Sequence, residues 1–397
     1  MKTTGTMKLF FAASVLSVCL LTNCKKNDLQ QPDNKVTVPL TSAAKASINF
    51  GKPIINTFAG GDMRGYSGDG GLVKNALLNS PQNVYVNKKG DVYITDFGNS
   101  VIRKVDAKTG IITTVAGNGS NGFSGDGGPA TQASLSNAFH TATDDNGNLY
   151  ISDLSNNRIR RVDAVTGIIQ TIAGTGNLGF NGDGKKALET DLMGPFGLAF
   201  DKDGNLVFSD QYGLCLRKLN MTTQVITTVA GNPQSRGYGG DGGPAVQAMF
   251  NFIWNVACDR IHGDIYVNDQ SNGRVRKINP STGIITTVAG SGNYGDSGMG
   301  GPATSASFEQ PVGIAVDKNG NLYIADQYLS QVYAVNKQTG IINLVAGNGT
   351  NGYYGDGGPA VLSVLSWTNS LSIDANGVLY INDSNNNRIR TITGLAN

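Results

Sequence analysis

A repeated unit of nearly constant length constrains the fold of this chain more than any single motif does. Six segments resemble TVAG and end in glycine, and six segments resemble ISD and end in aspartate. The glycines are Gly60, Gly117, Gly174, Gly231, Gly290 and Gly347, and the aspartates are Asp96, Asp153, Asp210, Asp269, Asp326 and Asp383. Successive glycines are 57, 57, 57, 59 and 57 residues apart, and the aspartates keep step. Such a period predicts one supersecondary unit stacked several times.

Each unit contains four short apolar runs separated by turn sequences. In the second unit the runs are 140–144, 148–153, 158–163 and 167–174, and they are rich in Val, Ile, Tyr and Thr. Runs of this length and composition predict strands, and the Gly and Asn residues between them are typical of hairpin turns. Both faces of these strands carry apolar residues, as expected for small sheets packed radially. The sequence therefore predicts an all-β fold, a six-bladed β-propeller of four-stranded antiparallel blades.

The two ends of the repeat array predict how the ring closes. The last unit has only three strands before the chain reaches Asn397, whereas a spare strand of the missing type lies at 54–59. We expect strand 54–59 to join the last blade beside 388–393, because closure removes an open sheet edge.

The repeats resemble NHL repeats. The resemblance rests on the runs P-x-G-[LI]-A-[FV]-D, G-N-L-[YV]-[IF]-x-D and N-R-[IV]-R-[KR]-[VI] followed by TGIITTVAG, and it covers residues 54–397. The third strands lack the signature histidine of that family. The resemblance implies a six-bladed propeller that serves as a binding platform. A minority of related six-bladed propellers are enzymes, including amidating lyases, lactonases and strictosidine synthase-like proteins.

The N-terminal segment reads as an export signal that ends in a lipidation site. Lys2 and Lys8 precede an apolar run at 9–21 that is too short to span a bilayer. The following Leu-Thr-Asn-Cys resembles a bacterial lipobox, with Asn23 departing from the usual small residue, and Cys24-Lys-Lys-Asn resembles lipoproteins of the Bacteroidota. We expect a signal peptide at 1–23, a lipidated Cys24 with a flexible tether at 24–52, and the propeller at 53–397. The alternative is an ordinary cleaved signal with an incidental cysteine.

The composition bears on two questions, whether the chain binds nucleic acid and whether its cysteines form a disulfide. Without Lys2 and Lys8 the chain has 29 basic and 29 acidic residues, and no cluster of Lys and Arg predicts a nucleic-acid partner. Outside the signal and the lipobox, only Cys215 and Cys258 remain, and we interpret them as small buried residues rather than a disulfide. We expect a monomer attached to the membrane by its lipid, in the cell envelope on the periplasmic or the surface face of the outer membrane.

The mouth of the central channel is the predicted binding site. The start of each first strand lies there together with the loops that follow the second and fourth strands. A residue that differs between blades at these positions is a better ligand contact than one repeated six times. Aromatic residues on blades two to four face amides on blades one and six, as in a small-ligand site. The candidate residues are Trp254, Phe196, Phe139, His140, Asn83, Asn255, Gln82, Asn369 and Trp367. The alternative is that the aromatic residues simply plug the channel.

Repeated residues are interpreted as structural. We expect the six ISD aspartates to form Asx-type turns, and the arginines of the NRIR segments to be solvated or to bond between blades. The GDGG loops are expected to be compact caps, each pinned by an aromatic residue three positions earlier. The loop before blade five departs at Asp296 and Met299 and is a candidate ligand or partner contact.

Catalysis has little support in the sequence. The chain has two histidines, and the nearest acid to the channel mouth is Glu309. The sequence requires no cofactor, although a central Ca²⁺ bound by amide oxygens is an alternative. We therefore expect a non-catalytic platform for a glycan, a small metabolite or a partner protein. The alternatives are a divalent-cation-dependent lyase or lactonase and a pure protein-interaction scaffold.

Overall fold

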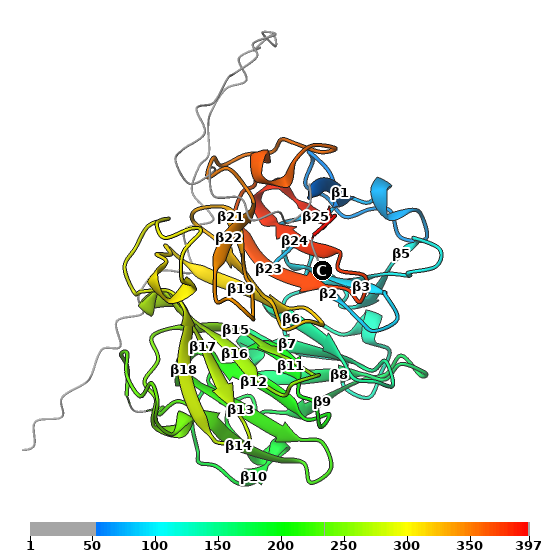
Figure 1. Cartoon of the computed structure of the whole chain (residues 1–397). Coiled ribbons are helices and arrows are strands. Elements are labelled where there is room, and N and C mark those ends of the chain that lie inside the picture. Colours follow the sequence, from blue (N-terminus) through cyan, green and yellow to red (C-terminus); the bar gives the residue numbers. More distant parts are fainter. Residues whose placement is uncertain (1–52, 234, 396–397) are drawn as a thin grey trace, which may run out of the picture. The chain divides into compact units, whose positions relative to one another are not determined.

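The described residues form a ring of six antiparallel sheets (Figure 1). The computed structural model describes residues 53–233 and 235–395. The predicted signal peptide, the lipidation site at Cys24 and the tether lie outside the described residues. Within them, no helix is long and apolar enough to cross a membrane.

The blades follow one another along the chain. Blade one is β2 (Asn83–Val86), β3 (Val92–Asp96), β4 (Val101–Val105) and β5 (Ile112–Ala116); blade two is β6 (Ala138–Thr143), β7 (Leu149–Asp153), β8 (Arg158–Val162) and β9 (Ile169–Ala173). Blade three is β11 (Pro195–Phe200), β12 (Leu206–Asp210), β13 (Cys215–Asn220) and β14 (Val225–Ala230), with β10 (Lys185–Lys186) at its edge. Blade four is β15 (Ile253–Cys258), β16 (Ile265–Asp269), β17 (Arg274–Asn279) and β18 (Ile284–Ala289). Blade five is β19 (Pro311–Val316), β20 (Leu322–Asp326), β21 (Gln331–Val335) and β22 (Ile342–Ala346).

Blade six contains both ends of the array. It is β23 (Thr368–Ile373), β24 (Leu379–Asp383), β25 (Arg388–Thr393) and β1 (Ile54–Gly60). β1 runs antiparallel to β25 from Ile54 opposite Thr393 to Gly60 opposite Arg388 (Figure 1). The predicted closure of the ring is confirmed.

Three-residue 3-10 turns connect the strands. They are Val73–Asn75, Phe97–Asn99, Ala130–Gln132, Leu154–Asn156, Ala187–Glu189, Gln211–Gly213, Ala245–Gln247, Gln270–Asn272, Ala303–Ser305, Ala360–Leu362 and Ser384–Asn386. Five of these turns directly follow an ISD aspartate and join the second strand of a blade to its third, and blade five has an ordinary turn at this place.

Packing between neighbouring blades supplies the core. All residues of the second strands β3, β7, β12, β16, β20 and β24 are buried, because both faces of each sheet contact another blade. One cluster, for example, combines Tyr93 and Ile102 of blade one with Leu149 and Ile151 of blade two. Each blade therefore requires its neighbours to bury its apolar residues.

The glycine that ends each fourth strand is required by a close approach. Gly117 has a φ of +91°, and a Cβ built there would lie 2.4 Å from the carbonyl oxygen of Ser100 in the preceding turn. A side chain at this position would clash with backbone, which explains why glycine recurs at the end of every TVAG-like segment.

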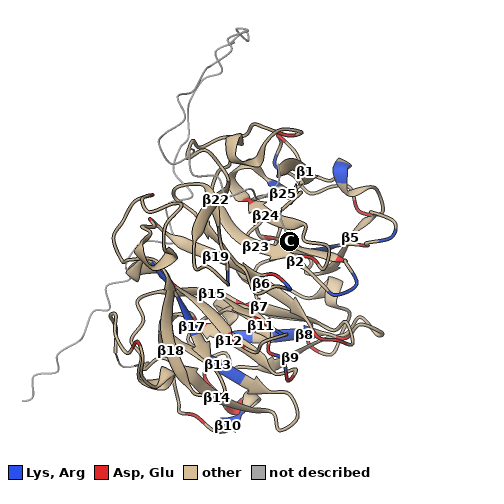
Figure 2. Ribbon diagram, in the orientation of Figure 1, with Lys and Arg blue, Asp and Glu red and all other residues tan. Residues whose placement is uncertain are grey.

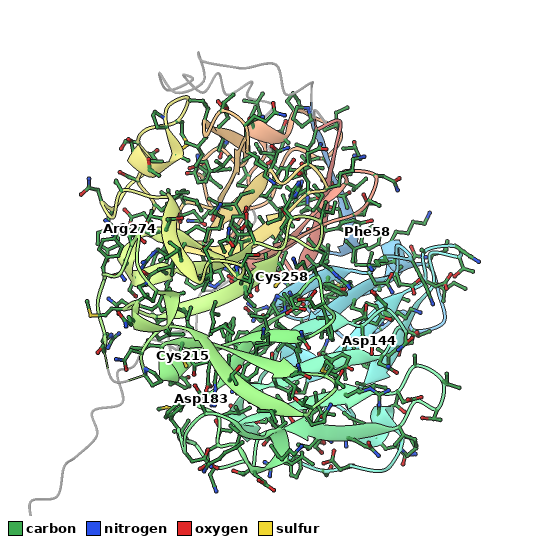
Figure 3. The ribbon with its side chains drawn as sticks, turned by 60° about the horizontal axis from the view of Figure 1, so that its bottom comes forward. Phe58, Asp144, Asp183, Cys215, Cys258 and Arg274 are labelled. Atoms are coloured by element: carbon green, nitrogen blue, oxygen red, sulfur yellow. The ribbon has the colours of Figure 1, made fainter. Side chains whose placement is uncertain are left out.

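The two cysteines of the propeller are free thiols. Cys215 lies in β13 of blade three and Cys258 lies in β15 of blade four (Figure 3). Cys215 is buried and Cys258 is partly buried, in agreement with the prediction that they do not form a disulfide.

Candidate functional site

Aromatic side chains from blades one to four gather at the predicted channel mouth. The ring centroids of Phe139 and Phe196 are 4.6 Å apart, and those of Phe196 and Trp254 are 4.7 Å apart. Phe97 contacts Phe139 at 4.9 Å, and Phe252 lies 6.4 Å from Trp254. We call these five residues the aromatic cluster. The sequence placed Phe139, Phe196 and Trp254 together but missed Phe97, which follows an ISD aspartate in the turn between β3 and β4.

Amide side chains occupy the opposite half of the mouth. The Asn369 Nδ2 donates to Gln82 Oε1 at 2.5 Å, and Gln327 Nε2 donates to Asn369 Oδ1 at 2.5 Å. Gln82 Nε2 also donates to the Ser384 hydroxyl at 3.2 Å. The predicted pair from blades one and six is therefore in contact. Gln327 and Ser384 were missed, although both directly follow an ISD aspartate and so share the position of Phe97.

Asn83 and Asn255 tie neighbouring blades together. Asn83 is fully buried, donates to the Ser370 hydroxyl at 2.8 Å and accepts from the backbone N–H of Thr141 at 3.2 Å. Asn255 donates to the carbonyl oxygens of Val312 at 3.0 Å and Asn369 at 3.4 Å. Their amide N–H groups therefore join blades six and one, and blades four, five and six. Their role as ligand contacts stays a prediction.

His140 is a neutral hydrogen-bonding group. Its Nδ1 accepts the backbone N–H of Leu198 at 3.3 Å, which links blades two and three. Burial lowers the pKa of His140 to about 4, because the charged imidazolium would lose its hydration. An accepting Nδ1 places the proton of the neutral ring on Nε2. His140 thus offers an N–H donor and no positive charge at neutral pH.

Trp367 is separated from Trp254 in its packing. Trp367 contacts Tyr328, with ring centroids 5.4 Å apart, and its backbone N–H donates to the Ser330 hydroxyl at 3.3 Å. It therefore lies with blade five side chains on the amide side of the mouth.

Blade four presents polar atoms that lack a partner within the described residues. Trp254 Nε1, Asn255 Oδ1 and Gln270 Oε1 are buried and make no hydrogen bond there. Gln270 begins the turn after β16, and its backbone N–H donates to the carbonyl oxygen of Phe252 at 3.1 Å. These three atoms are one donor and two acceptors, and the side-chain amide of Asn268 and Arg276 Nε on the same blade are unpaired as well among the described residues.

The acidic residues near the mouth do not assemble into a metal site in the described part of the chain. Residues 53–233 and 235–395 contain no group of three or more His, Cys, Asp or Glu side chains that could hold an ion. The backbone N–H of Glu309 donates to Asp326 at 2.7 Å. The second histidine, His262, lies in the turn after β15 and bonds Asp259 at 2.7 Å.

The ISD aspartates and the NRIR arginines have a different role from the one predicted. Arg276 is fully buried, and its guanidinium lies 3.2 Å from Asp269 of the same blade and 2.6 Å from Asp241 of the preceding GDGG loop. Asp269 also accepts the backbone N–H of Asn251 at 2.8 Å. Each such arginine therefore pins a loop to its own blade, rather than being solvated or bonding between blades. The same triad occurs in Asp69–Arg103–Asp96, Asp126–Arg160–Asp153, Asp183–Arg217–Asp210 and Asp356–Arg390–Asp383.

The aromatic residues of the GDGG loops pack on these arginines, as expected for loops that are each pinned by an aromatic residue. The guanidinium carbon of Arg276 lies 5.1 Å from the ring centroid of Tyr238, and that of Arg274 lies 3.8 Å from it. Cation–π contact therefore holds each GDGG loop against its blade.

Blade five keeps the ISD aspartate, Asp326, and replaces the other two members of the triad. Tyr333 stands where the other blades have arginine, and Met299 stands in place of the loop aspartate. Met299 packs against the cluster that contains Tyr333 and Phe308. The departure of this loop, which suggested a ligand contact, is thus matched by a change in the core.

Comparison with known proteins agrees with this architecture. Residues 60–123 match the family described as the Teneurin NHL domain. The chain is 26% identical to Suppressor of Quenching 1 of Arabidopsis thaliana over 64% of its length, 29% identical to Teneurin-3 of Mus musculus over 77%, and 24% identical to NHL repeat-containing protein 2 of Gallus gallus over 69%. The matches span 25%, 12% and 41% of those relatives.

Solved structures share the fold. A protein of unknown function from Bacteroides thetaiotaomicron superposes with a TM-score of 0.61 at 20% identity, covering 86% of this chain and 75% of that one. An auxiliary nutrient-binding protein from Bacteroides ovatus gives a TM-score of 0.61 at 14% identity, covering 86% and 76%. With its six repeated blades, the described part of this chain is a six-bladed β-propeller whose repeats are similar to NHL repeats.

Proposed function

We propose that this propeller is a non-catalytic binding platform whose ligand site is the channel mouth beside blade four. The observation that carries the proposal is the group of unpaired polar atoms at Trp254, Asn255 and Gln270, next to the aromatic cluster. A buried polar group without a hydrogen bond costs free energy, and a ligand that supplies the missing bond recovers it.

The ligand class that fits this corner is a neutral ring with hydroxyl groups, such as a sugar. A hydroxyl can accept from Trp254 Nε1 and can donate to the amide oxygens of Asn255 and Gln270. The apolar face of a sugar ring matches the partly exposed rings of Phe139 and Trp254. His140, neutral at pH 7, adds a donor without adding charge.

Other propellers of this fold are binding proteins. The N-terminal sequence suggests that this chain binds its ligand at the cell envelope. Auxiliary nutrient-binding proteins of Bacteroides share the propeller. We propose that a lipid on Cys24 attaches the chain to the cell envelope. Only the lipobox-like sequence supports this attachment, since Cys24 lies outside the described residues.

Tryptophan fluorescence provides a direct test, because both tryptophans of the chain are predicted mouth residues. A Trp367→Phe protein keeps Trp254 as its single tryptophan. Neutral oligosaccharides, titrated into this protein, should shift or quench its emission and saturate. Trp254→Phe, which keeps a ring and removes the Nε1 donor, should weaken binding about tenfold by calorimetry, as expected for one lost hydrogen bond to a buried site.

Phe180→Ala provides a matched control, because Phe180 is an exposed aromatic residue in a GDGG loop. This variant should bind as the wild type does. Unchanged emission with every oligosaccharide would refute the sugar site. Weakened binding in Phe180→Ala would move the site to the loops instead.

A further inference from the structure

A cavity of about 530 Å³ lies between blades two and three, on the face opposite the channel mouth. It is reached from the turns after the first and third strands of these blades, and Asp144, which lines it, is labelled in Figure 3. The volume falls in the range of small-molecule sites. The corresponding groove between blades five and six, lined by Leu395, encloses only about 10 Å³. These two grooves lie at equivalent positions, so the repeat alone does not produce a cavity of this size.

One part of the cavity lining is the turn after the third strand of blade three, and this turn differs from its counterparts in other blades. Gln224 has a φ of +57°, whereas the same turn position is glycine in four other blades. Those glycines are Gly110, Gly167, Gly283 and Gly340, with φ values of 67°, 68°, 69° and 68°. A non-glycine residue in this conformation is strained, and such strain is concentrated at functional sites. Both Gln224 and its hydrogen-bond partner Met221 line the cavity.

A second departure reaches the cavity from blade four. The turn after β15 is one residue longer than its counterparts, with Asp259 bonded to Asp264 where blade one has Asn87 bonded to Asp91. From this turn Arg260 reaches Asp145 of blade two, with nitrogen–oxygen distances of 3.0 and 3.1 Å. An asymmetric ligand requires a place where the blades differ, and two independent differences meet here.

The acids of the cavity already have partners. Asp144 accepts from the backbone N–H groups of Asn146 and Asn148, from the Asn148 side chain at 2.7 Å, and from the Tyr150 hydroxyl at 3.1 Å. Asp145 is paired with Lys88 at 2.8 Å as well as with Arg260. Neither carboxylate offers much capacity to bind a cationic ligand. Strand β8 (RIRRV), which borders the cavity, is coloured as basic in Figure 2.

The group in the cavity that can still bind a ligand is a hydrogen-bond donor, the guanidinium of Arg161. Arg161 lines the cavity and donates Nη2–H to Asp163 at 3.0 Å, while a guanidinium carries five N–H groups in a planar fork. Apolar surface is supplied by Ile172, Phe200 and Met221. Phe200 packs edge-to-face on Tyr150 with ring centroids 4.9 Å apart, so these rings form a wall and not an open stacking surface.

We propose that this cavity binds a small organic anion, with its carboxylate on Arg161 and its apolar body against Met221 and Phe200. The fork of a guanidinium matches a carboxylate in two parallel hydrogen bonds. Methionine adapts its shape to an apolar guest. This site is independent of the channel mouth and takes a ligand of a different class.

The test uses 4-fluorobenzoate as the probe and its neutral isostere 4-fluorobenzamide as the comparison, both followed by fluorine NMR. For a ligand of this size we expect saturable binding of the benzoate near 1 mM, on the order of what efficient small ligands achieve. The amide should bind at least about tenfold more weakly, because it cannot form the charge-assisted pair. Equal binding of the two compounds, or no saturable binding of the benzoate, would overturn the proposal.

Two variants locate the site. Arg161→Gln should weaken benzoate binding about tenfold, and Met221→Trp, which fills the cavity, should abolish it. Lys277→Gln is the matched control, because Lys277 holds the same strand position in blade four, where it is paired with Asp264 at 3.4 Å. The control should bind as the wild type does, and an equal loss there would refute the assignment. If Arg161→Gln fails to fold, Arg161→Lys should fold and retain only part of the affinity; full affinity would contradict the fork.

Discussion

Thr57 in β1 pairs directly with Arg390 in β25, so residues from the two ends of the described chain share one sheet. The same strand carries Ile55, which is fully buried and packs with Leu379, Ile381 and Ile392 of blade six. Closure therefore joins the ends both by backbone hydrogen bonds and by apolar contact.

Removing the closing strand should unfold the last blade. We compare a chain that begins at Pro53 with one that begins at Gly61. The shorter chain loses the β1 hydrogen bonds, each worth about 1 kcal/mol, and the burial of Ile55, worth about 2 kcal/mol. Its free energy of unfolding in urea should fall by at least about 5 kcal/mol, and its open edge should promote aggregation. Coincident unfolding curves would contradict closure by β1.

The buried arginine of a triad should be costly to remove alone. Arg276→Tyr leaves Asp269 fully buried without its guanidinium partner. Breaking a buried ion pair by removing one partner costs about 3–5 kcal/mol. Chemical denaturation of the variant should show a loss of this size.

The combination found in blade five should reduce that loss. Adding Asp241→Met and Tyr238→Asp to Arg276→Tyr recreates in blade four the residues that blade five has naturally. Asp241→Met removes the loop carboxylate that has lost its guanidinium partner, and Tyr238→Asp places a carboxylate only at an exposed position, so the triple variant should be more stable than Arg276→Tyr alone. If the free-energy changes of the three substitutions simply add, then the residues of blade five do not compensate for one another.

The stability of the protein should depend on pH through Asp326. This carboxyl is fully buried in the one blade that lacks the arginine, and burial raises its pKa to about 6 although three backbone N–H groups bond to it. The unfolded chain has an aspartate pKa of about 3.9, so the folded state binds the proton more tightly. Stability should therefore rise as pH falls from 7 to about 4.5, by about 2 kcal/mol from this group.

Asp326→Asn isolates that contribution. The substitution removes the titrating group, so the difference in melting temperature between wild type and variant should widen as pH falls from 7 to about 4.5. A difference that stays constant over this range would show that the pKa of Asp326 is the same in the folded and unfolded states.

Truncation of Trp254 separates a binding surface from a plug. If its main contribution is to ligand binding, Trp254→Ala should lose oligosaccharide binding and destabilise the fold by about 1 kcal/mol, as for a partly exposed site. A buried plug would instead cost about 3–5 kcal/mol. Measuring calorimetric affinity and urea unfolding on the same variant decides between them, and a large stability loss with unchanged affinity would exclude the mouth as the site.

Cys24 should carry the lipid. Cys24→Ala should abolish labelling by a fatty-acid analogue and release the protein from the membrane fraction, because it removes the thiol that we propose as the acceptor of the lipid. Label that persists on the variant would show that the lipobox interpretation is wrong. Cys215→Ala is the control, since its free buried thiol should leave labelling unchanged.

The sequence by itself determined the fold, because the same pattern of strands and turns is repeated six times. The spacing from Gly60 to Gly347 set the number of blades, and the missing fourth strand after 388–393 predicted the partner of 54–59. It also brought Phe139, Phe196 and Trp254 to one place, since equivalent positions in neighbouring blades must be adjacent.

Only the tertiary structure shows what the repeated arginines and aspartates bind. It also shows where a departure from the repeat leaves a cavity. The partners of Arg276 come from a strand and from a loop distant in sequence, so its burial could not be read from local pattern. The cavity beside Arg161 depends on Gln224 and on the reach of Arg260 across a blade. A repeat specifies the contacts that recur around the ring, whereas a site depends on side chains from several blades whose distances no period encodes.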